Sequence, residues 1–281
     1  MSSFEKGMII SAPGSPIDYT QGTTGAVAPE PLKTLHPDQA NYARLHALQQ
    51  SLASPTAAAP TRYTCASESP SPGNLRHAGP AALQVGLAPV IPRWARSQTV
   101  NFAALSDGYP QPELAHIAAN ALREAAEEWS DLDLGVRFKW VQRIQDASFV
   151  LCYGGDHGEA FAQAFFPNGN ELSSLVVYAA AFRPGVVRYL KNIFLHELGH
   201  VLGFRHEFAP QVYGDNEGIQ LGPRDPHSVM GDEFPPQLQA SDRESAMAFY
   251  RFSGSAIGWQ GSNEPPSSNS NGLPIKDYIA R

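Results

Sequence analysis

The sequence of 281 residues contains only two cysteines, Cys65 and Cys152. Two cysteines cannot build the disulfide network on which small secreted domains depend, so a disulfide scaffold is excluded and the redox compartment is left open. Apolar runs of membrane-spanning length are also missing, so we expect no membrane span. Basic residues number 20 against 27 acidic ones, for a net charge of −7. We therefore expect no nucleic acid partner, because nucleic acids bind basic faces.

A recognisable signal peptide is missing as well, because the apolar run near Met1 is short and Glu5 interrupts it. Residues 1–90 are rich in Pro, Ala and Ser and are predicted to be largely irregular, as a pro-segment could be. One short amphipathic helix is expected between Pro37 and Ala53. Residues 91–255 are expected to form the folded domain, and residues 256–281 a flexible polar tail.

The folded domain combines patterns typical of strands and of helices. Helical apolar spacing covers Pro112–Trp129 and Val187–Leu202, and a last helix is expected from Ser241, which we take as its capping residue. Strand patterns are "TVNFAAL", "VRFKWVQ", "ASFVLCYG", "AFAQAFFP" and "LSSLVVYAAAF". This order predicts an α+β fold in which helices back a twisted mixed β-sheet.

The stretch "IFLHELGHVLGFRHEF" is the most informative in the chain. On a helix, His196 and His200 lie one turn apart on one face, where two imidazoles can bind one metal ion. Gly203 is expected to end the helix in a left-handed turn, so that the chain returns and offers His206 as a third ligand. Three protein ligands with one open position are typical of a catalytic zinc, and Glu197 is placed to act as general base towards a zinc-bound water.

This string, H-E-x-x-H-x-x-G-x-x-H, resembles that of the metzincin zinc endopeptidases, over about residues 95–255. "HSVMGD" resembles the Met-turn of that family, which makes Met230 an apolar floor beneath the histidines. The pair His206-Glu207 after "GF" is similar to the astacin signature, and "GGDHGEAFAQAFFPNG" resembles the structural-zinc stretch of matrixins. The resemblance implies a metzincin-type zincin fold with an active-site helix and a C-terminal helix.

The chain departs from these relatives at two places. Asp232 stands where astacins carry a tyrosine metal ligand. In the matrixin-like stretch, His157 fits the first zinc ligand, Glu159 replaces an aspartate and Gln163 replaces a histidine. Because an amide is a poor zinc ligand, we expect one catalytic zinc and no second, structural zinc.

The function predicted is that of a zinc-dependent metalloendopeptidase, a hydrolase that acts on peptide or protein substrates. An extended substrate could pair with the strand "LSSLVVYAAAF", expected at the sheet edge. Two alternatives stay open: a non-catalytic zinc-binding scaffold, and a metal-dependent hydrolase of a non-peptide substrate. Family relatives are mostly extracellular, whereas the missing signal peptide leaves a cytoplasmic location open.

Two further residues carry hypotheses. Cys65 could occupy the open zinc position and hold the enzyme latent, as matrixin pro-segments do, but its flanking residues lack that pattern and an idle cysteine is favoured. Glu207 is expected either to pair with a nearby arginine such as Arg205 or, as in astacins, to bind an amino terminus that processing before the first strand would create.

Overall fold

Helices and strands are mixed along the chain, in keeping with the α+β class expected from the sequence. This computed structural model describes residues 32–39, 41–54, 56–67, 83–85, 87, 89–207, 219–222, 225–257 and 273–280. The α-helices are α1 (Tyr42–Leu52), α2 (Pro112–Ser130), α3 (Leu190–Val201) and α5 (Ala240–Arg251), and the 3₁₀ helices are η1 (Pro37–Gln39), η2 (Ile144–Asp146), η3 (Ala179–Phe182) and η4 (Val187–Tyr189). The strands are β1 (Leu83–Val85), β2 (Ile91–Trp94), β3 (Gln98–Ala104), β4 (Val136–Trp140), β5 (Phe149–Tyr153), β6 (Ala162–Gln163), β7 (Ser173–Val177), β8 (Phe204–Arg205), β9 (Ile219–Leu221), β10 (Ala256–Ile257) and β11 (Leu273–Tyr278).

The largest sheet has five strands in the order β4-β3-β5-β7-β6. The first four are parallel to their neighbours, and β6 runs antiparallel to β7 at the edge. Strands β3 and β5 are buried on both faces: Phe102 and Phe149 face the main core, whereas Ala103 and Val150 face a smaller apolar cluster behind. The mixed sheet predicted from the sequence is therefore present, and β6 forms its edge.

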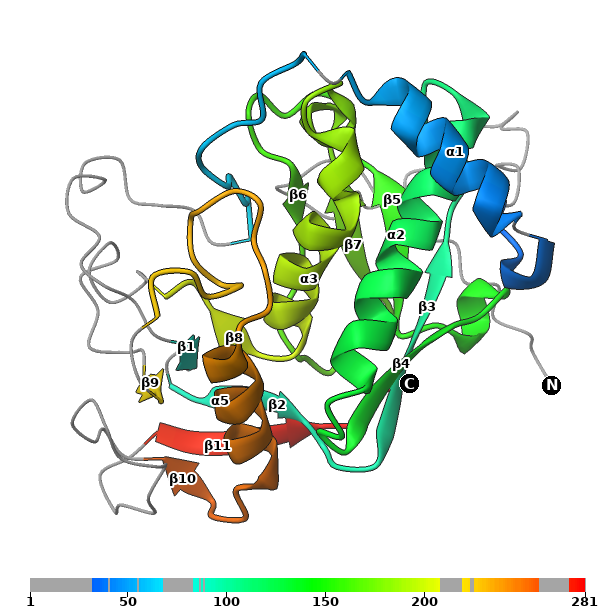
Figure 1. Ribbon diagram of the computed structural model, residues 1–281. Coiled ribbons are helices and arrows are strands. Elements are labelled where there is room, and N and C mark those ends of the chain that lie inside the picture. The colour runs from blue at the N-terminus through cyan, green and yellow to red at the C-terminus, as the bar shows by residue number, and fades with distance from the viewer. Residues whose placement is uncertain are drawn as a thin grey trace, which may run out of the picture. The chain divides into compact units, whose positions relative to one another are not determined.

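Helices α2 and α3 lie side by side on one face of this sheet (Figure 1). Helix α2 is amphipathic, and its apolar stripe of Leu114, Ile117, Leu122 and Trp129 is buried. The Trp129 indole N–H donates to the Leu195 carbonyl of α3 at 2.9 Å, which ties the two helices together at the level of the first histidine. Helix α1 packs on the outside of α2 (Figure 1).

Two three-stranded sheets lie beyond the C-terminal end of α3. One has the order β8-β1-β9, and the other the order β10-β11-β2. Strand β1 comes from the segment before residue 90, yet it pairs with β8, which leads directly to the third histidine. Strand β11 comes from the C-terminal end of the chain and pairs in parallel with β2.

Several expectations about elements were wrong. The helix expected between Pro37 and Ala53 is present as α1, but the segment 1–90 also contributes β1, and the expected tail over 256–281 contributes β10 and β11. The stretch "LSSLVVYAAAF" forms a strand only as far as Val177, since 3₁₀ helix η3 follows, and this strand is interior rather than at the edge. The last helix is capped by Gln239 in a capping box with Asp242, not by Ser241.

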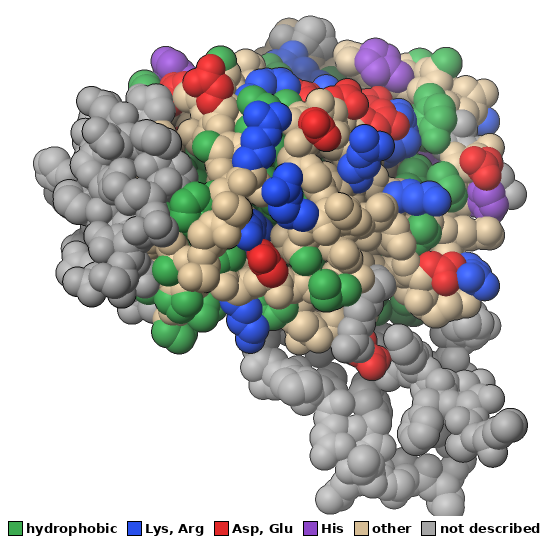
Figure 2. Space-filling model, turned by 90° about the horizontal axis from the view of Figure 1, so that it is seen from below, with side chains coloured by type: hydrophobic (Ala, Val, Ile, Leu, Met, Phe, Trp, Pro, Cys, Tyr) green, Lys and Arg blue, Asp and Glu red, His purple; other side chains and the backbone are tan. Residues whose placement is uncertain are grey.

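Across the part of the chain that the structure describes, no helix combines the length and apolar character needed to cross a membrane. On the face seen in Figure 2, Lys and Arg side chains are interspersed with Asp and Glu side chains. Mixed signs of this kind are typical of a solvated surface.

Candidate metal centre and its covering segment

Helix α3 buries both histidines of its H-E-x-x-H motif. Ile193, Phe194, Leu198 and Val201 pack into the core on either side of them, which explains why a helix with three ionisable residues near its end lies in the interior. The helix ends as expected at Gly203, whose φ is +99°. A Cβ there would lie 2.5 Å from the Pro92 carbonyl oxygen, so the turn requires glycine.

The turn brings the third histidine back to the first two. The Nε2 atom of His206 lies 3.2 Å from that of His196 and 3.3 Å from that of His200. The Nδ1 atoms of His196 and His200 each lie 2.8 Å from a backbone carbonyl, of Val229 and Phe204 respectively. Each of these two rings therefore carries its proton on Nδ1 and points the lone pair of Nε2 into the cluster.

These separations fit a tetrahedral zinc ion. With Zn–N bonds of about 2.0–2.1 Å, two nitrogen ligands at a tetrahedral angle lie about 3.3–3.4 Å apart. Burial is the main cause that lowers the pKa of all three histidines, that of His200 to about 4. The neighbouring imidazoles lower the pKa of His196 and His206 further, and the Arg205 charge lowers that of His200 and His206. The rings are therefore neutral near pH 7, which is the form that binds metal.

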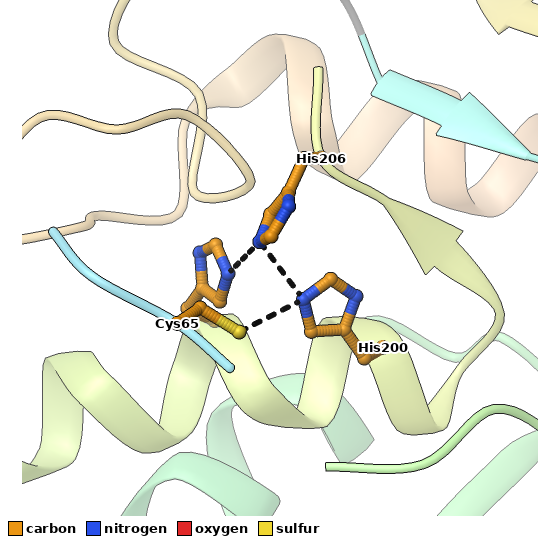
Figure 3. A group of neighbouring side chains, drawn as sticks. Cys65, His200 and His206 are labelled. Carbon is orange, nitrogen blue, oxygen red and sulfur yellow. Dashed lines mark hydrogen bonds between the residues drawn. The ribbon is translucent and has the colours of Figure 1, made fainter. Parts of the chain in front are cut away.

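Cys65 is the fourth member of this cluster, although the sequence favoured an idle cysteine. Its Sγ atom lies 3.5 Å from the His200 Nε2, and Figure 3 shows it pointing into the space between His200 and His206. The four ligand atoms of Cys65, His196, His200 and His206 all lie within 4.8 Å of one another, so this buried group could hold a metal ion. Among the described residues it is the one such group of three or more candidate ligands.

The turn Ser228–Gly231 lies beneath the histidines. Met230 is fully buried, and its sulfur fills the space beside Gly199, where a Cβ would meet it at 2.3 Å. Asp242, on α5, accepts hydrogen bonds from the Ser228 hydroxyl and from the Val229 N–H. The carboxylate of Asp242 therefore holds the turn whose Val229 carbonyl orients His196.

Glu197 is fully buried beside the cluster, and both of its carboxylate oxygens are hydrogen-bonded. The Tyr63 hydroxyl donates to Oε1 at 2.7 Å, and the Ser67 hydroxyl donates to Oε2 at 2.8 Å. Burial raises the pKa of Glu197 to about 7, and the hydrogen bonds from these two hydroxyls oppose that rise. A carboxyl with a pKa near neutrality can both accept and return a proton.

Tyr63, Cys65 and Ser67 all come from one extended stretch, Thr61–Ser67, which we call the covering segment. On one side it bonds to the loop after Met230, through Tyr63 N–H to the Asp232 carbonyl at 2.7 Å and Phe234 N–H to the Thr61 carbonyl at 3.3 Å. On the other side it bonds along the edge strand β6, where Ala66 N–H donates to the Ala162 carbonyl at 3.0 Å. The space above the histidines is therefore occupied by an extended piece of this chain.

The matrixin-like stretch is arranged differently from a zinc site. His157 is exposed and stacks on the Tyr178 ring, with centroids 4.5 Å apart. The carboxylate of Glu159 pairs with Arg183 at 2.6 Å, and the Gln163 side-chain oxygen accepts from the Tyr178 hydroxyl at 2.7 Å. These three side chains contact Tyr178 or Arg183, and the expected loss of a second zinc stays a prediction.

Glu207 lies under the turn that contains Met230 and is 1% exposed. Among the described residues, neither of its carboxylate oxygens has a hydrogen bond of good geometry, and the nearby Ser228 hydroxyl donates to Asp242 instead. Burial raises the pKa of Glu207 to about 9; the nearby Ser228 hydroxyl opposes that rise, and the carboxylates of Asp242 and Asp225 add to it. The expected surface pairing with an arginine is therefore wrong, and the amino-terminus pairing stays a prediction.

Sequence reasoning missed Tyr63, Ser67 and Asp242. The first two lie about 130 residues before Glu197, and the visible signal was the alternation Tyr-x-Cys-x-Ser, which places three polar side chains on one face of an extended stretch. Comparison with known proteins adds no assignment, because neither a family model nor a curated protein matches this chain.

Proposed function

We propose that this protein is a zinc-dependent endopeptidase of the metzincin type, with a catalytic site that the covering segment holds latent. The observation that carries the proposal is the convergence of the Nε2 atoms of His196, His200 and His206, at separations that suit zinc, next to a buried Glu197. A zinc ion bound there would polarise a scissile carbonyl and lower the pKa of a water molecule.

The chain's own residues supply the proton transfers. Once the two hydroxyls of the covering segment have left, the Glu197 carboxylate is free to take a proton from the attacking water and to return it to the leaving amine. The pKa of about 7 that burial gives Glu197 suits both steps, although the charge of a nearby metal ion would lower it.

A peptide is the substrate class that the surroundings favour. The covering segment is itself an extended peptide in the site. Its Ala66 N–H donates to Ala162 of β6, and its Thr64 carbonyl accepts from the N–H of Phe161, the residue before β6, at 2.9 Å. Edge strands bind extended peptides by adding them to the sheet. Strand β6, rather than the β7 stretch expected from the sequence, offers that edge.

Cys65 supports a second candidate, a non-catalytic zinc scaffold. A sulfur 3.5 Å from the His200 Nε2 suits the fourth corner of a tetrahedron, and closed four-ligand sites are typical of structural zinc. Against this candidate, a structural site has no use for a buried glutamate beside the ligands, and burying one is costly. We therefore interpret Cys65 as the ligand of a latent state.

The test compares the full-length chain with Cys65→Ala and with Cys65→Ala/Glu197→Ala, by elemental analysis and by digestion of casein. We expect one zinc per chain in all three, and casein hydrolysis by Cys65→Ala that a chelator abolishes and added zinc restores. Loss of the general base should then lower the rate about 10²–10⁴-fold. Zinc binding without hydrolysis of casein in any form would favour the scaffold, and turnover of small esters alone would favour a non-peptide hydrolase.

A further inference from the structure

The covering segment reaches the candidate general base as well as the candidate metal ligands. Its residues alternate, so that Tyr63, Cys65 and Ser67 face the site whereas Arg62 and Thr64 are exposed. The central residue meets the histidine cluster through its sulfur, and the two flanking residues meet Glu197 through their hydroxyls. One short stretch therefore engages two chemically different groups.

The contacts on Glu197 use both of its oxygens. Tyr63 donates to Oε1 at 2.7 Å and Ser67 donates to Oε2 at 2.8 Å, so each carboxylate oxygen already has a donor from the covering segment. The Tyr63 ring also fills the space beside the site, with its centroid 4.3 Å from that of His196 and 5.6 Å from that of Phe161. Water and substrate are both kept away from the carboxylate.

The hydroxyls are held in place from the far side. Tyr63 is anchored by its N–H on the Asp232 carbonyl, and the Ser67 hydroxyl accepts from the Ala164 N–H at 2.7 Å while it donates to Glu197. Hydrogen bonds to a buried charged group are among the stronger ones, because leaving the charge unpaired is costly. Both hydroxyls donate to Glu197 rather than to the Cys65 sulfur, although the Ser67 N–H donates to that sulfur at 3.2 Å and so links the two sets of contacts through the backbone.

We infer that Tyr63 and Ser67 form a second lock, on the general base, which keeps the covering segment closed even when Cys65 no longer binds the metal. The closure itself is a property of the chain, and its effect on hydrolysis rests on the function proposed above. It follows that modifying or removing the thiol gives only partial release, and that full release requires loss of the two hydroxyls as well.

The first arm of the test measures closure without any need for hydrolysis. The rate at which iodoacetamide alkylates Cys65 is determined by peptide mapping, which separates Cys65 from the buried Cys152, in the zinc-loaded chain and again after chelation. Tyr63→Phe retains the ring, and Ser67→Ala removes the other hydroxyl. Each substitution should raise the rate of Cys65 alkylation about tenfold, because that factor corresponds to the free energy of one hydrogen bond to a charged group. Tyr42→Phe and Ser51→Ala, which remove hydroxyls from α1 of the same N-terminal region, should leave the rate unchanged.

The second arm compares casein hydrolysis by full-length Cys65→Ala with that by Tyr63→Phe/Cys65→Ala/Ser67→Ala, with thermal unfolding as a check on folding. We expect the triple variant to be at least about tenfold faster. Faster alkylation without hydrolysis in any variant would overturn the proposed function and leave the lock standing. Alkylation rates equal to those of the control variants, or equal hydrolysis by the single and triple variants, would overturn the lock.

Discussion

Buried ionisable side chains are the unusual feature of the stretch from His196 to Glu207. Burial of an unpaired charge is costly, so each such group needs a reason to be there. The three imidazoles are kept neutral by burial and converge on one point, and Glu197 is satisfied by two hydroxyls of the covering segment. The described contacts give the Glu207 carboxylate no positively charged partner and no hydrogen bond of good geometry, so the dependence of stability on pH is informative at this residue.

We expect stability to fall with rising pH through Glu207. Its pKa is 4.5 in an unfolded chain and about 9 in the folded one, so the carboxyl is neutral in both states below pH 4.5 and ionises only in the unfolded state between those values. The stabilising contribution is thus complete at low pH and is lost at up to about 1.4 kcal/mol per pH unit as the pH rises. Urea unfolding at pH 5, 6.5 and 8 should show Glu207→Gln gaining stability relative to the parent chain as the pH increases.

The exposed Glu244→Gln on α5 is the control, and its curve should run parallel to that of the parent chain. A Glu207→Gln curve that also ran parallel, or that fell relative to the parent with rising pH, would show that a positive partner such as an amino terminus balances the carboxylate. In that case the hypothesis drawn from the astacin signature would replace the neutral carboxyl.

Among the elements, the turn at Gly203 positions the third histidine. Gly203→Ala should destabilise the chain by more than about 2 kcal/mol, because it adds a backbone clash to the cost of a left-handed conformation. A Cβ at this position would lie 2.5 Å from the Pro92 carbonyl oxygen, and either the turn or β2 would have to move. Zinc affinity should fall together with stability, as measured by metal competition and urea unfolding.

Gly158→Ala is the control that separates the cost of the left-handed backbone conformation from the cost of the steric clash at Gly203. Gly158 has a φ of +64° but no atom within 4 Å of its would-be Cβ, so only the left-handed strain of about 1–2 kcal/mol applies and zinc affinity should not change. Equal effects of the two substitutions on zinc binding would contradict the positioning role of the turn.

Elements were predictable where their signal is local. Helix α2 could be identified from consecutive residues because it buries one apolar stripe, and α3, which is buried on all sides from Ile193 to Val201, because its histidines recur at helical spacing. Strands β6, β10 and β11 could not be bounded, since they are short or depend on a distant partner: β11 pairs with β2, about 180 residues earlier. The 3₁₀ turn that ends the β7 stretch was hidden because its Ala residues suit either structure.

The residues of the candidate site likewise divide into those with a local sequence signal and those without one. The histidines, Glu197 and Gly203 lie within eleven residues, and helix periodicity alone places the first two histidines on one face. Cys65 and the two hydroxyls reach the site only through the tertiary fold, by the pairing of the covering segment with β6 and with the loop after Met230. The spacing of residues along the sequence does not reveal that the covering segment pairs with β6.

At the scale of the whole molecule, segments from the N-terminal and C-terminal regions of the described chain both contribute to the surroundings of the candidate metal centre. The covering segment lies over the histidines, and β11 supports β2, whose Trp94 indole N–H donates to the Val201 carbonyl at the end of α3 at 2.7 Å. Asp277 on β11 makes two hydrogen bonds to the Arg93 guanidinium, at 2.8 and 3.2 Å. The C-terminal strand is therefore part of the folded domain, not an appended tail.

Asp277→Ala should consequently destabilise the chain by about 1–2 kcal/mol, because it leaves the charge of Arg93 without its carboxylate. The Arg93 side chain is 5% exposed and that of Asp277 is 46% exposed, so solvent screens part of the effect. Asp146→Ala, which breaks a similar pair with Arg143 on the surface, should cost less than Asp277→Ala, because solvent screens an exposed pair. Urea unfolding of both variants tests this, and equal losses would show that β11 contributes no more than a surface pair.

The central claim is that Glu197 acts as a general base beside three zinc-binding histidines. The most direct measurement is casein hydrolysis by Tyr63→Phe/Cys65→Ala/Ser67→Ala, with and without the isosteric Glu197→Gln, at a zinc content verified by elemental analysis. We expect one zinc per chain in both and a rate about 10²–10⁴-fold lower with glutamine. Equal rates at equal zinc content, or no hydrolysis by either chain, would contradict the account.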